Sequence, residues 1–230
     1  MASVPLIHLG VVDSTQSFLA RHPELGFCGV LADAQTAGRG RGGNSWESEP
    51  GAGLWLSARL PIVPQAGVLL SAMEAVAEIL GPCDVRLGIK WPNDLVAYKA
   101  VGQAKTLVKI GGIIGEQKID CAILGLGLNI HSAPEMPERA IPPASLVSLG
   151  GGPIPSIVEL AQNILSAWQN LEAPRQTAFR WPAHGDRIQW EDGSGTCQGW
   201  QDDGRLAVQT QTGMELLASG DVRGIMGEQQ

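Results

Sequence analysis

The chain has 230 residues, of which 44% are hydrophobic and 17% are charged. This length and apolar content are enough for one large domain, or for one domain with a small module, and they exclude a disordered chain. The formal net charge of -7 argues against binding of nucleic acid across the whole surface, so any anion that binds must meet a local basic site.

The cysteines and the N-terminal residues indicate the cellular compartment of the protein. The four cysteines, at positions 28, 83, 121 and 197, form no CxxC pair and lie near no His cluster, which predicts buried, reduced thiols rather than a zinc site or a disulfide framework. The first residues lack the basic start of a signal peptide. No stretch reaches the roughly 20 apolar residues that span a bilayer. We therefore expect a cytoplasmic protein with no membrane contact.

Short strands and helices alternate in the first half of the chain. Strands are predicted at 6–9, 28–32, 54–60 and 85–90. Helix-starting residues stand at 13–15. A second helix is predicted at 65–80, where apolar residues recur at helical spacing until Gly81-Pro82 ends it. Between 33 and 49 lies a polar stretch without periodicity.

The second half predicts a hairpin, a loop, a helix and a β-rich tail. Residues 107–116 and 121–130 are typical of two strands turning around 118–120, and 132–155 is a proline-containing loop. A helix is predicted at 156–172, with Ser156 as its cap and Glu159 three residues later. Short β-like pieces follow at 187–190, 196–201, 206–209, 214–217 and 221–225. This predicts an α+β protein with a main domain at 1–180 and a small antiparallel β-barrel at 181–230.

The segment from Gln35 to Trp46, QTAGRGRGGNSW, is the first candidate site. Its glycines let the backbone approach a ligand, Arg39 and Arg41 can clamp an anion, and Trp46 can stack on a flat ring. A flexible surface loop is the alternative, because the segment has neither the context of a dinucleotide fingerprint nor the GK[ST] ending of a P-loop.

Three further segments combine polar residues with glycines or a rigid turn: Lys90-Trp91-Pro92-Asn93-Asp94, Lys109-Ile110-Gly111-Gly112 and Gly125-Leu126-Gly127-Leu128-Asn129. Each has a purely structural interpretation, as a turn, a solvated strand-end lysine and a β-bulge respectively. Each also fits a ligand site, because glycines within a strand open space beside the backbone.

In this order and spacing the segments resemble the biotin–protein ligase family. The resemblance also includes Asp13-Ser14-Thr15 and Leu54-Trp55-Leu56-Ser57, and it extends loosely to Ser219-Gly220-Asp221-Val222. It implies a class II synthetase-like catalytic domain followed by an SH3-like β-barrel. It also implies that ATP activates biotin to biotinyl-5′-AMP, with Mg²⁺ on the phosphates. The biotin then passes to a lysine of the biotin carboxyl carrier protein of acetyl-CoA carboxylase.

The resemblance assigns roles to individual residues. Catalysis is expected from Arg39, Arg41, Lys109 and Asp94. Biotin is expected to contact Ser14, Thr15, Gln16, Gln35, Gly38, Arg39, Arg41, Lys109, Gly111 and Gly112. ATP is expected to contact Arg39, Arg41, Trp46, Asn93, Lys109 and Asn129. Leu54 and Leu56 are candidates for the wall of the aliphatic chain, and Asp94 has a turn role as its alternative. The interpretation requires Arg39, Arg41 and Lys109 to face one cleft.

The chain departs from the family pattern at three places. Gly42, Gly43 and Asn44 replace further arginines, Gln16 stands where the family commonly has Asn, and 97–107 is longer than usual. Only twelve residues precede Asp13, so no N-terminal DNA-binding domain and no repressor function are expected. The resemblance leaves monomer and homodimer both open.

Three rival functions remain. A lipoate–protein ligase also forms an acyl-adenylate, but lipoate lacks the ureido group that Gln35 would serve. A non-catalytic vitamin-binding module would not need Lys109, Arg39 and Arg41. A dinucleotide-dependent oxidoreductase would need a strand–GxGxxG–helix unit, which the sequence lacks.

Overall fold

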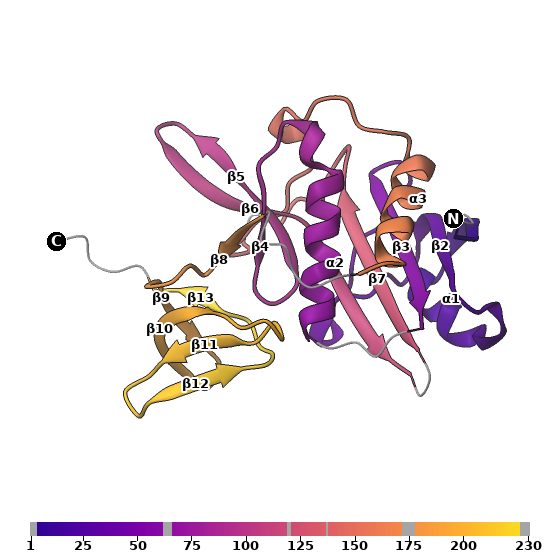
Figure 1. Ribbon diagram of the computed structural model, residues 1–230. Coiled ribbons are helices and arrows are strands. Elements are labelled where there is room, and N and C mark those ends of the chain that lie inside the picture. The colour runs from indigo at the N-terminus through magenta and orange to yellow at the C-terminus, as the bar shows by residue number, and fades with distance from the viewer. Residues whose placement is uncertain (1–3, 62–65, 119–120, 137, 172–177, 226–230) are drawn as a thin grey trace.

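The computed structural model describes residues 4–61, 66–118, 121–136, 138–171 and 178–225. Its larger part is an eight-stranded mixed sheet (Figure 1). The strands lie in the order β1 (Leu6–Val12), β2 (Cys28–Gln35), β3 (Gly53–Leu60), β7 (Ala122–Asn129), β6 (Ala104–Gln117), β5 (Asp94–Val101), β4 (Leu87–Lys90) and β8 (Phe179–Trp181). Only the outer pairs β1–β2 and β4–β8 are parallel in this sheet. The α+β prediction is confirmed.

The main core lies between the sheet and two helices, α2 (Ala66–Ile79) and α3 (Ile157–Trp168), which pack together over one face (Figure 1). Ser156 caps α3 by accepting a hydrogen bond from the Glu159 backbone N–H at 3.3 Å, as the sequence predicts. The indole of Trp168 is buried here and donates to the Ala72 carbonyl at 3.2 Å. The sequence predicts this helix to 172, but it ends at Trp168, and residue 172 itself lies outside the described residues.

Helix α1 (Thr15–Arg21) packs on the opposite face of the sheet, over β2, β3 and β7. Because side chains alternate along a strand, Val30 and Ile123 face α1, whereas Leu31 and Leu124 face the main core. Arg59 is buried at the end of α1 and donates to the carbonyls of Leu19 and His22 and to the Cys121 thiol. A cation at a helix C-terminus satisfies its free carbonyls and matches its dipole.

A small antiparallel sheet forms the C-terminal part. Its order is β12 (Met214–Leu217), β11 (Leu206–Gln209), β10 (Gly193–Trp200), β9 (Arg187–Trp190) and β13 (Arg223–Gly224). The predicted strands at 187–190, 206–209 and 214–217 are confirmed. Trp91, which leaves the large sheet after β4, is buried among the apolar side chains of this module, and its Nε1 donates to the Gly204 carbonyl at 2.9 Å. The division into domains at 180/181 stays a prediction, since β8, at 179–181, pairs with β4.

Two strands were missed by the sequence analysis, β5 and β8. The outer half of β5 is exposed and lacks apolar alternation, so its strand character comes from pairing with β6. The predicted hairpin of β6 and β7 is confirmed, although residues 119–120 of its turn lie outside the described residues. The four cysteines are buried and free, as predicted. Among the described residues no helix is long and apolar enough to cross a membrane.

Replacing Arg59 by Met should lower the free energy of unfolding by about 1–3 kcal/mol, because the buried Leu19 and His22 carbonyls lose their donor. The matched control Arg205→Met removes a 43%-exposed side chain paired with Asp203 and should cost less than about 0.5 kcal/mol. Urea denaturation followed by tryptophan fluorescence measures both. Equal midpoints for the two variants would contradict the structural role of Arg59.

Candidate active site

The floor of the site is a row of residues that run across the sheet in direct register. Trp55 on β3 lies opposite Gly127 on β7, Gly127 opposite Gly112 on β6, Gly112 opposite Asp94 on β5, and Asp94 opposite Lys90 on β4. Directly opposed residues point to the same face of a sheet. The two glycines therefore leave the middle of this face open between a tryptophan and two charged residues.

Trp46 fills part of the space that Gly127 leaves. A Cβ added at Gly127 would lie 2.4 Å from the Trp46 indole, so only glycine lets this ring pack on the strand. The ring meets Trp55 edge-on, with centroids 6.4 Å apart. Lys109 Nζ lies 5.4 Å from the Trp46 ring centroid, which is within the range of a cation–π contact.

A β-bulge in β6 orients the Lys109 side chain toward the site. On β6, Gly111 pairs with Leu95 but Lys109 pairs with the next residue, Val96, so Ile110 is the extra residue. Residues three apart on a regular strand would face opposite sides. The bulge shifts this alternation, so both Lys109 and Gly112 line the site while Ile110 is buried in the core. The bulge explains why a Lys-x-x-Gly spacing can serve one pocket.

The row opens into a pocket of about 1130 Å³ between the sheet, the glycine-rich loop and the C-terminal module. Every residue assigned from the sequence lines it except two glycines: the lining includes Ser14, Thr15, Gln16, Gln35, Arg39, Arg41, Trp46, Asn93, Asp94, Lys109, Gly112 and Asn129. A Cβ at Gly38 would lie 2.3 Å from the Trp46 carbonyl oxygen, and one at Gly111 would lie 2.5 Å from the Gly127 carbonyl oxygen. Gly38 and Gly111 therefore shape the backbone around the pocket. Leu54 and Leu56 are both buried in the main core, and of the two only Leu56 is among the residues that line the pocket.

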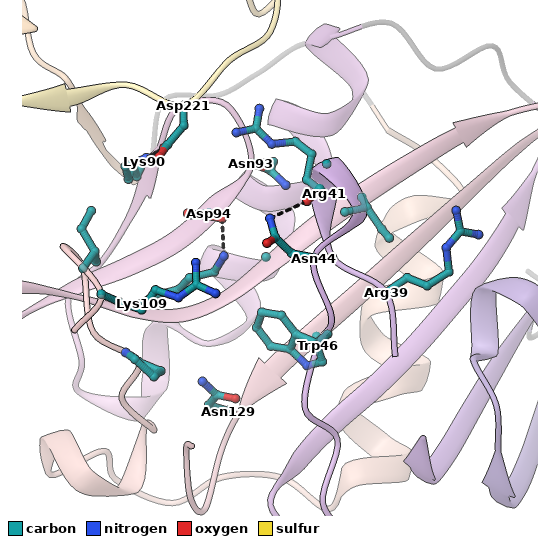
Figure 2. Close-up of a pocket in the computed structure, with 18 of the residues that line it drawn as sticks. Arg39, Arg41, Asn44, Trp46, Lys90, Asn93, Asp94, Lys109, Asn129 and Asp221 are labelled. Atoms are coloured by element: carbon teal, nitrogen blue, oxygen red, sulfur yellow. Dashed lines mark hydrogen bonds and ion pairs between the residues drawn. The ribbon is translucent and has the colours of Figure 1, made fainter. Parts of the chain in front are cut away.

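The centre of the pocket is an ion pair. Lys109 Nζ lies 2.6 Å from Asp94 Oδ1, and the side chains are 29% and 20% exposed (Figure 2). The turn that presents Asp94 is tied to β6, because Asn93 donates through Nδ2 to the Ile113 carbonyl at 2.7 Å and accepts from the Ile113 N–H at 3.0 Å. The pair is therefore held by strands on both sides and is less screened by water than a surface pair.

The two arginines of the loop differ in position. Arg41 lies in a 3₁₀ turn, Arg41–Gly43, next to the module residue Asp221 (Figure 2). Arg39 points away from Lys109 in Figure 2 and pairs with Glu116 at 3.4 Å, with half of its side chain exposed. All three cations thus line one pocket, as the sequence interpretation requires, but Arg39 sits at its edge.

The backbone conformation of the loop explains the two glycines that follow Arg41. Gly42 and Gly43 have φ angles of 63° and 80°, a region that side chains with a Cβ rarely adopt. Asn44 closes the same turn by donating from Nδ2 to the Arg41 carbonyl at 2.8 Å. Gly42, Gly43 and Asn44 therefore form and close the turn that carries Arg41.

The other end of the pocket is polar and neutral. Gln35 Oε1 accepts from the Thr15 backbone N–H at 2.8 Å and from its hydroxyl at 3.1 Å, and the Thr15 hydroxyl contacts that of Ser57 at 2.8 Å. Gln16 is 3% exposed, and its Oε1 has no hydrogen-bond partner. A buried acceptor without a donor costs free energy, so Gln16 suits a ligand that brings an N–H group.

The C-terminal module closes one side of the pocket through Lys90 and Asp221. Lys90 Nζ lies 2.7 Å from Asp221 Oδ1 and 5.6 Å from the Trp181 ring centroid. Partial burial raises the pKa of Asp221, but the hydrogen bond and charge of Lys90, with the charges of Arg223 and Arg41, outweigh it and lower this pKa overall. The sequence predicted no individual role for either residue, although Lys90 stands in the candidate segment with Asn93 and Asp94, and Asp221 stands in the tail segment of the resemblance.

The chain resembles known ligases along most of its length. It is 28% identical to the bifunctional ligase/repressor BirA of Bacillus spizizenii, over 94% of this chain and 73% of that protein. It is also 28% identical to the biotin–[acetyl-CoA-carboxylase] ligase of Mycobacterium tuberculosis, over 84% and 77% respectively.

The fold has a close counterpart in a biotin protein ligase from Aquifex aeolicus, solved with biotin and ATP. The TM-score is 0.76 at 24% identity, over 96% of this chain and 98% of that one. The family model for biotin/lipoate A/B protein ligases matches residues 11–129, which is just over half of the 230 residues and includes the whole row of the site. The chain therefore belongs to the biotin/lipoate A/B protein ligase family.

Proposed function

We propose that the protein is a biotin–protein ligase, which forms biotinyl-5′-AMP from biotin and ATP and transfers biotin to a carrier lysine. The observation that carries this function is one pocket with two chemically different ends, a neutral polar end at Thr15, Gln16 and Gln35 and a cationic end at Arg41 and Lys109. The names of the relatives and the ligands of the Aquifex aeolicus structure support the same substrates.

Biotin has a neutral ureido ring, which needs both donors and acceptors. Gln16 Oε1 is a buried acceptor without a partner and would take a ureido N–H. The Ser57 hydroxyl, which lies 2.8 Å from that of Thr15, would donate to the ureido oxygen, with the backbone at Gly112 and Gly125 making room. This arrangement favours biotin over lipoate, whose ring carries no N–H donor.

The cationic end would join the two anions of the first step. The biotin carboxylate oxygen attacks the α-phosphorus of ATP, the anhydride bond between the α- and β-phosphates breaks, and pyrophosphate leaves with the electron pair of that bond. Lys109 and Arg41 would offset the repulsion between carboxylate and phosphate and the charge that develops at phosphorus. We propose that Asn93 and Asn129 contact the phosphates and that Trp46 stacks on the adenine.

Asp94 would then act in the second step. It is held 2.6 Å from Lys109 and lies in the pocket where the carrier amine must arrive. A carboxylate there would orient the amine and accept its proton as the nitrogen attacks the biotinyl carbonyl and AMP leaves. Movement of Arg39 away from Glu116 would fold the glycine-rich loop over the adenylate and exclude water.

Mg²⁺ is proposed to enter with ATP, where it would supply charge neutralisation at the phosphates. The described residues contain no group of three or more His, Cys, Asp or Glu side chains placed to hold a metal ion. The neutral amides of Asn93 and Asn129 would contact phosphate oxygens or water on the ion. The proposed acceptor is the biotin carboxyl carrier protein of acetyl-CoA carboxylase.

Exchange of labelled pyrophosphate into ATP tests the proposed function. We expect exchange with biotin and none with lipoate, because only biotin satisfies the buried Gln16 acceptor. Equal exchange with both acids, or exchange with lipoate alone, would show that the ureido interpretation is wrong.

Lys109→Ala should lower biotin-dependent exchange by about 100- to 1000-fold, the usual effect of removing one preorganised group at a developing charge. The control Lys99→Ala removes an exposed lysine from the neighbouring strand, outside the pocket lining, and should leave exchange unchanged. Exchange within a few-fold of the parent in Lys109→Ala would remove this residue from the mechanism.

Gln16→Leu should raise the KM for biotin about tenfold or more and leave the KM for ATP within about twofold, because the ureido N–H loses its acceptor. Gln162→Leu, at an exposed position of α3, is the matched control. Initial exchange rates at varied biotin and at varied ATP separate the two constants. A parallel rise of both would place Gln16 outside the biotin site.

A further inference from the structure

The β5–β6 hairpin extends beyond the rest of the sheet. Its strands pair from Asp94–Gly112 out to Val101–Ala104, whereas β7 pairs with β6 only from Gly111 onward. The hairpin projects from the sheet in Figure 1. Tyr98 and Val101 are 49% and 56% exposed.

One face of this hairpin continues the wall of the active-site pocket. Tyr98 lies opposite Leu107, and Ala100 lies opposite Lys105, so these four residues share a face. Lys105, Leu107 and Lys109 alternate along β6, and all three line the pocket together with Tyr98. At about 3.3 Å per residue, these three side chains extend along β6 over roughly 13 Å, from Lys109 at the reaction centre to Lys105.

The hairpin is positively charged in an acidic protein. From Leu95 to Gly115 the chain carries Lys99, Lys105 and Lys109 and no acidic residue, although the whole chain has a net charge of -7. Arg139, from the loop after β7, lines the same part of the pocket. A face that combines an exposed aromatic ring, an apolar side chain and a cation is typical of a protein-binding surface rather than of a solvated hairpin.

We propose that Tyr98, Lys105 and Leu107 form a docking track for the acceptor protein, and that the track receives an acidic chain segment beside the target lysine. The inference rests on the proposed function. The acceptor amine must reach the Lys109–Asp94 pair, so the chain that carries it passes over the wall of this pocket. The carboxylates of the segment pair with Lys105, and its apolar side chains pack on Tyr98 and Leu107.

The test compares Lys105→Glu with Lys99→Glu. The two variants make the same charge change on neighbouring strands, but Lys99 pairs with Thr106 on the opposite face and does not line the pocket. Each variant is assayed for biotin-dependent pyrophosphate exchange, for discharge of the adenylate by hydroxylamine, and for biotin transfer to the carrier domain of acetyl-CoA carboxylase at varied salt.

We expect Lys105→Glu to raise the KM for the carrier domain tenfold or more, while exchange and hydroxylamine discharge stay within twofold of the parent. Lys99→Glu should raise that KM less than threefold. The KM of the parent should increase with salt, because the attraction is electrostatic, and that of Lys105→Glu should depend on salt less steeply.

Each other outcome has a definite meaning. An unchanged carrier KM in Lys105→Glu, or equal rises in both variants, would overturn the docking track. A loss of exchange in Lys105→Glu would assign that residue to nucleotide binding and also overturn it. Absence of biotin-dependent exchange in the unaltered protein would instead show that the proposed function is wrong. Leu107→Ser provides a second variant with the charge preserved, and it should raise the carrier KM without affecting exchange.

Discussion

The site depends on a single irregularity in an otherwise regular sheet, the bulge at Ile110. A strand shows alternate residues to each face, so a side chain and a glycine three positions apart cannot serve the same pocket without an extra residue between them. The bulge gives Lys109 and Gly112 a common face and leaves Ile110 in the core. The lysine is thereby brought to Asp94, and the glycine keeps the floor open between them and Trp46. Restoring regular pairing would place either the cation or the open floor on the wrong side of the sheet.

Four cations of the pocket lie beside carboxylates. Lys109 pairs with Asp94, Arg39 with Glu116 and Lys90 with Asp221, and Arg41 lies near the same Asp221. These pairs hold positive charges at fixed positions and reduce the cost of keeping them partly out of water. A bound carboxylate or phosphate would compete with the acidic partners, most easily at the exposed Arg39 pair. In the proposed function the glycines of the loop would let Arg39 change partner.

The segment from Lys90 to Asp94 connects the parts of the molecule. Lys90 and Trp91 contact the C-terminal module, Asn93 is hydrogen-bonded to β6, and Asp94 faces Lys109. Five consecutive residues thus place the module beside the pocket and present a carboxylate inside it. Residues 219–224 of the module line the pocket for the same reason. The module is therefore a wall of the site as well as a separate β-sheet.

Much of this could be predicted from the sequence because the signals are local. Glycines in strands, helix caps such as Ser156, and the alternation of the tail strands act over a few residues, so they predicted the α+β class and most elements. The site residues were predicted from the resemblance of the ordered segments to a family, and all of them except Gly38 and Gly111 line the pocket. Strands β5 and β8 were missed because their strand character comes from partners elsewhere in the chain. The pairing of Lys90 with Asp221, across 131 positions, and the side of the hairpin that faces the pocket were decided only by the tertiary structure. Which residue meets which across a sheet depends on register and on a bulge, and neither is a property of any short stretch of sequence.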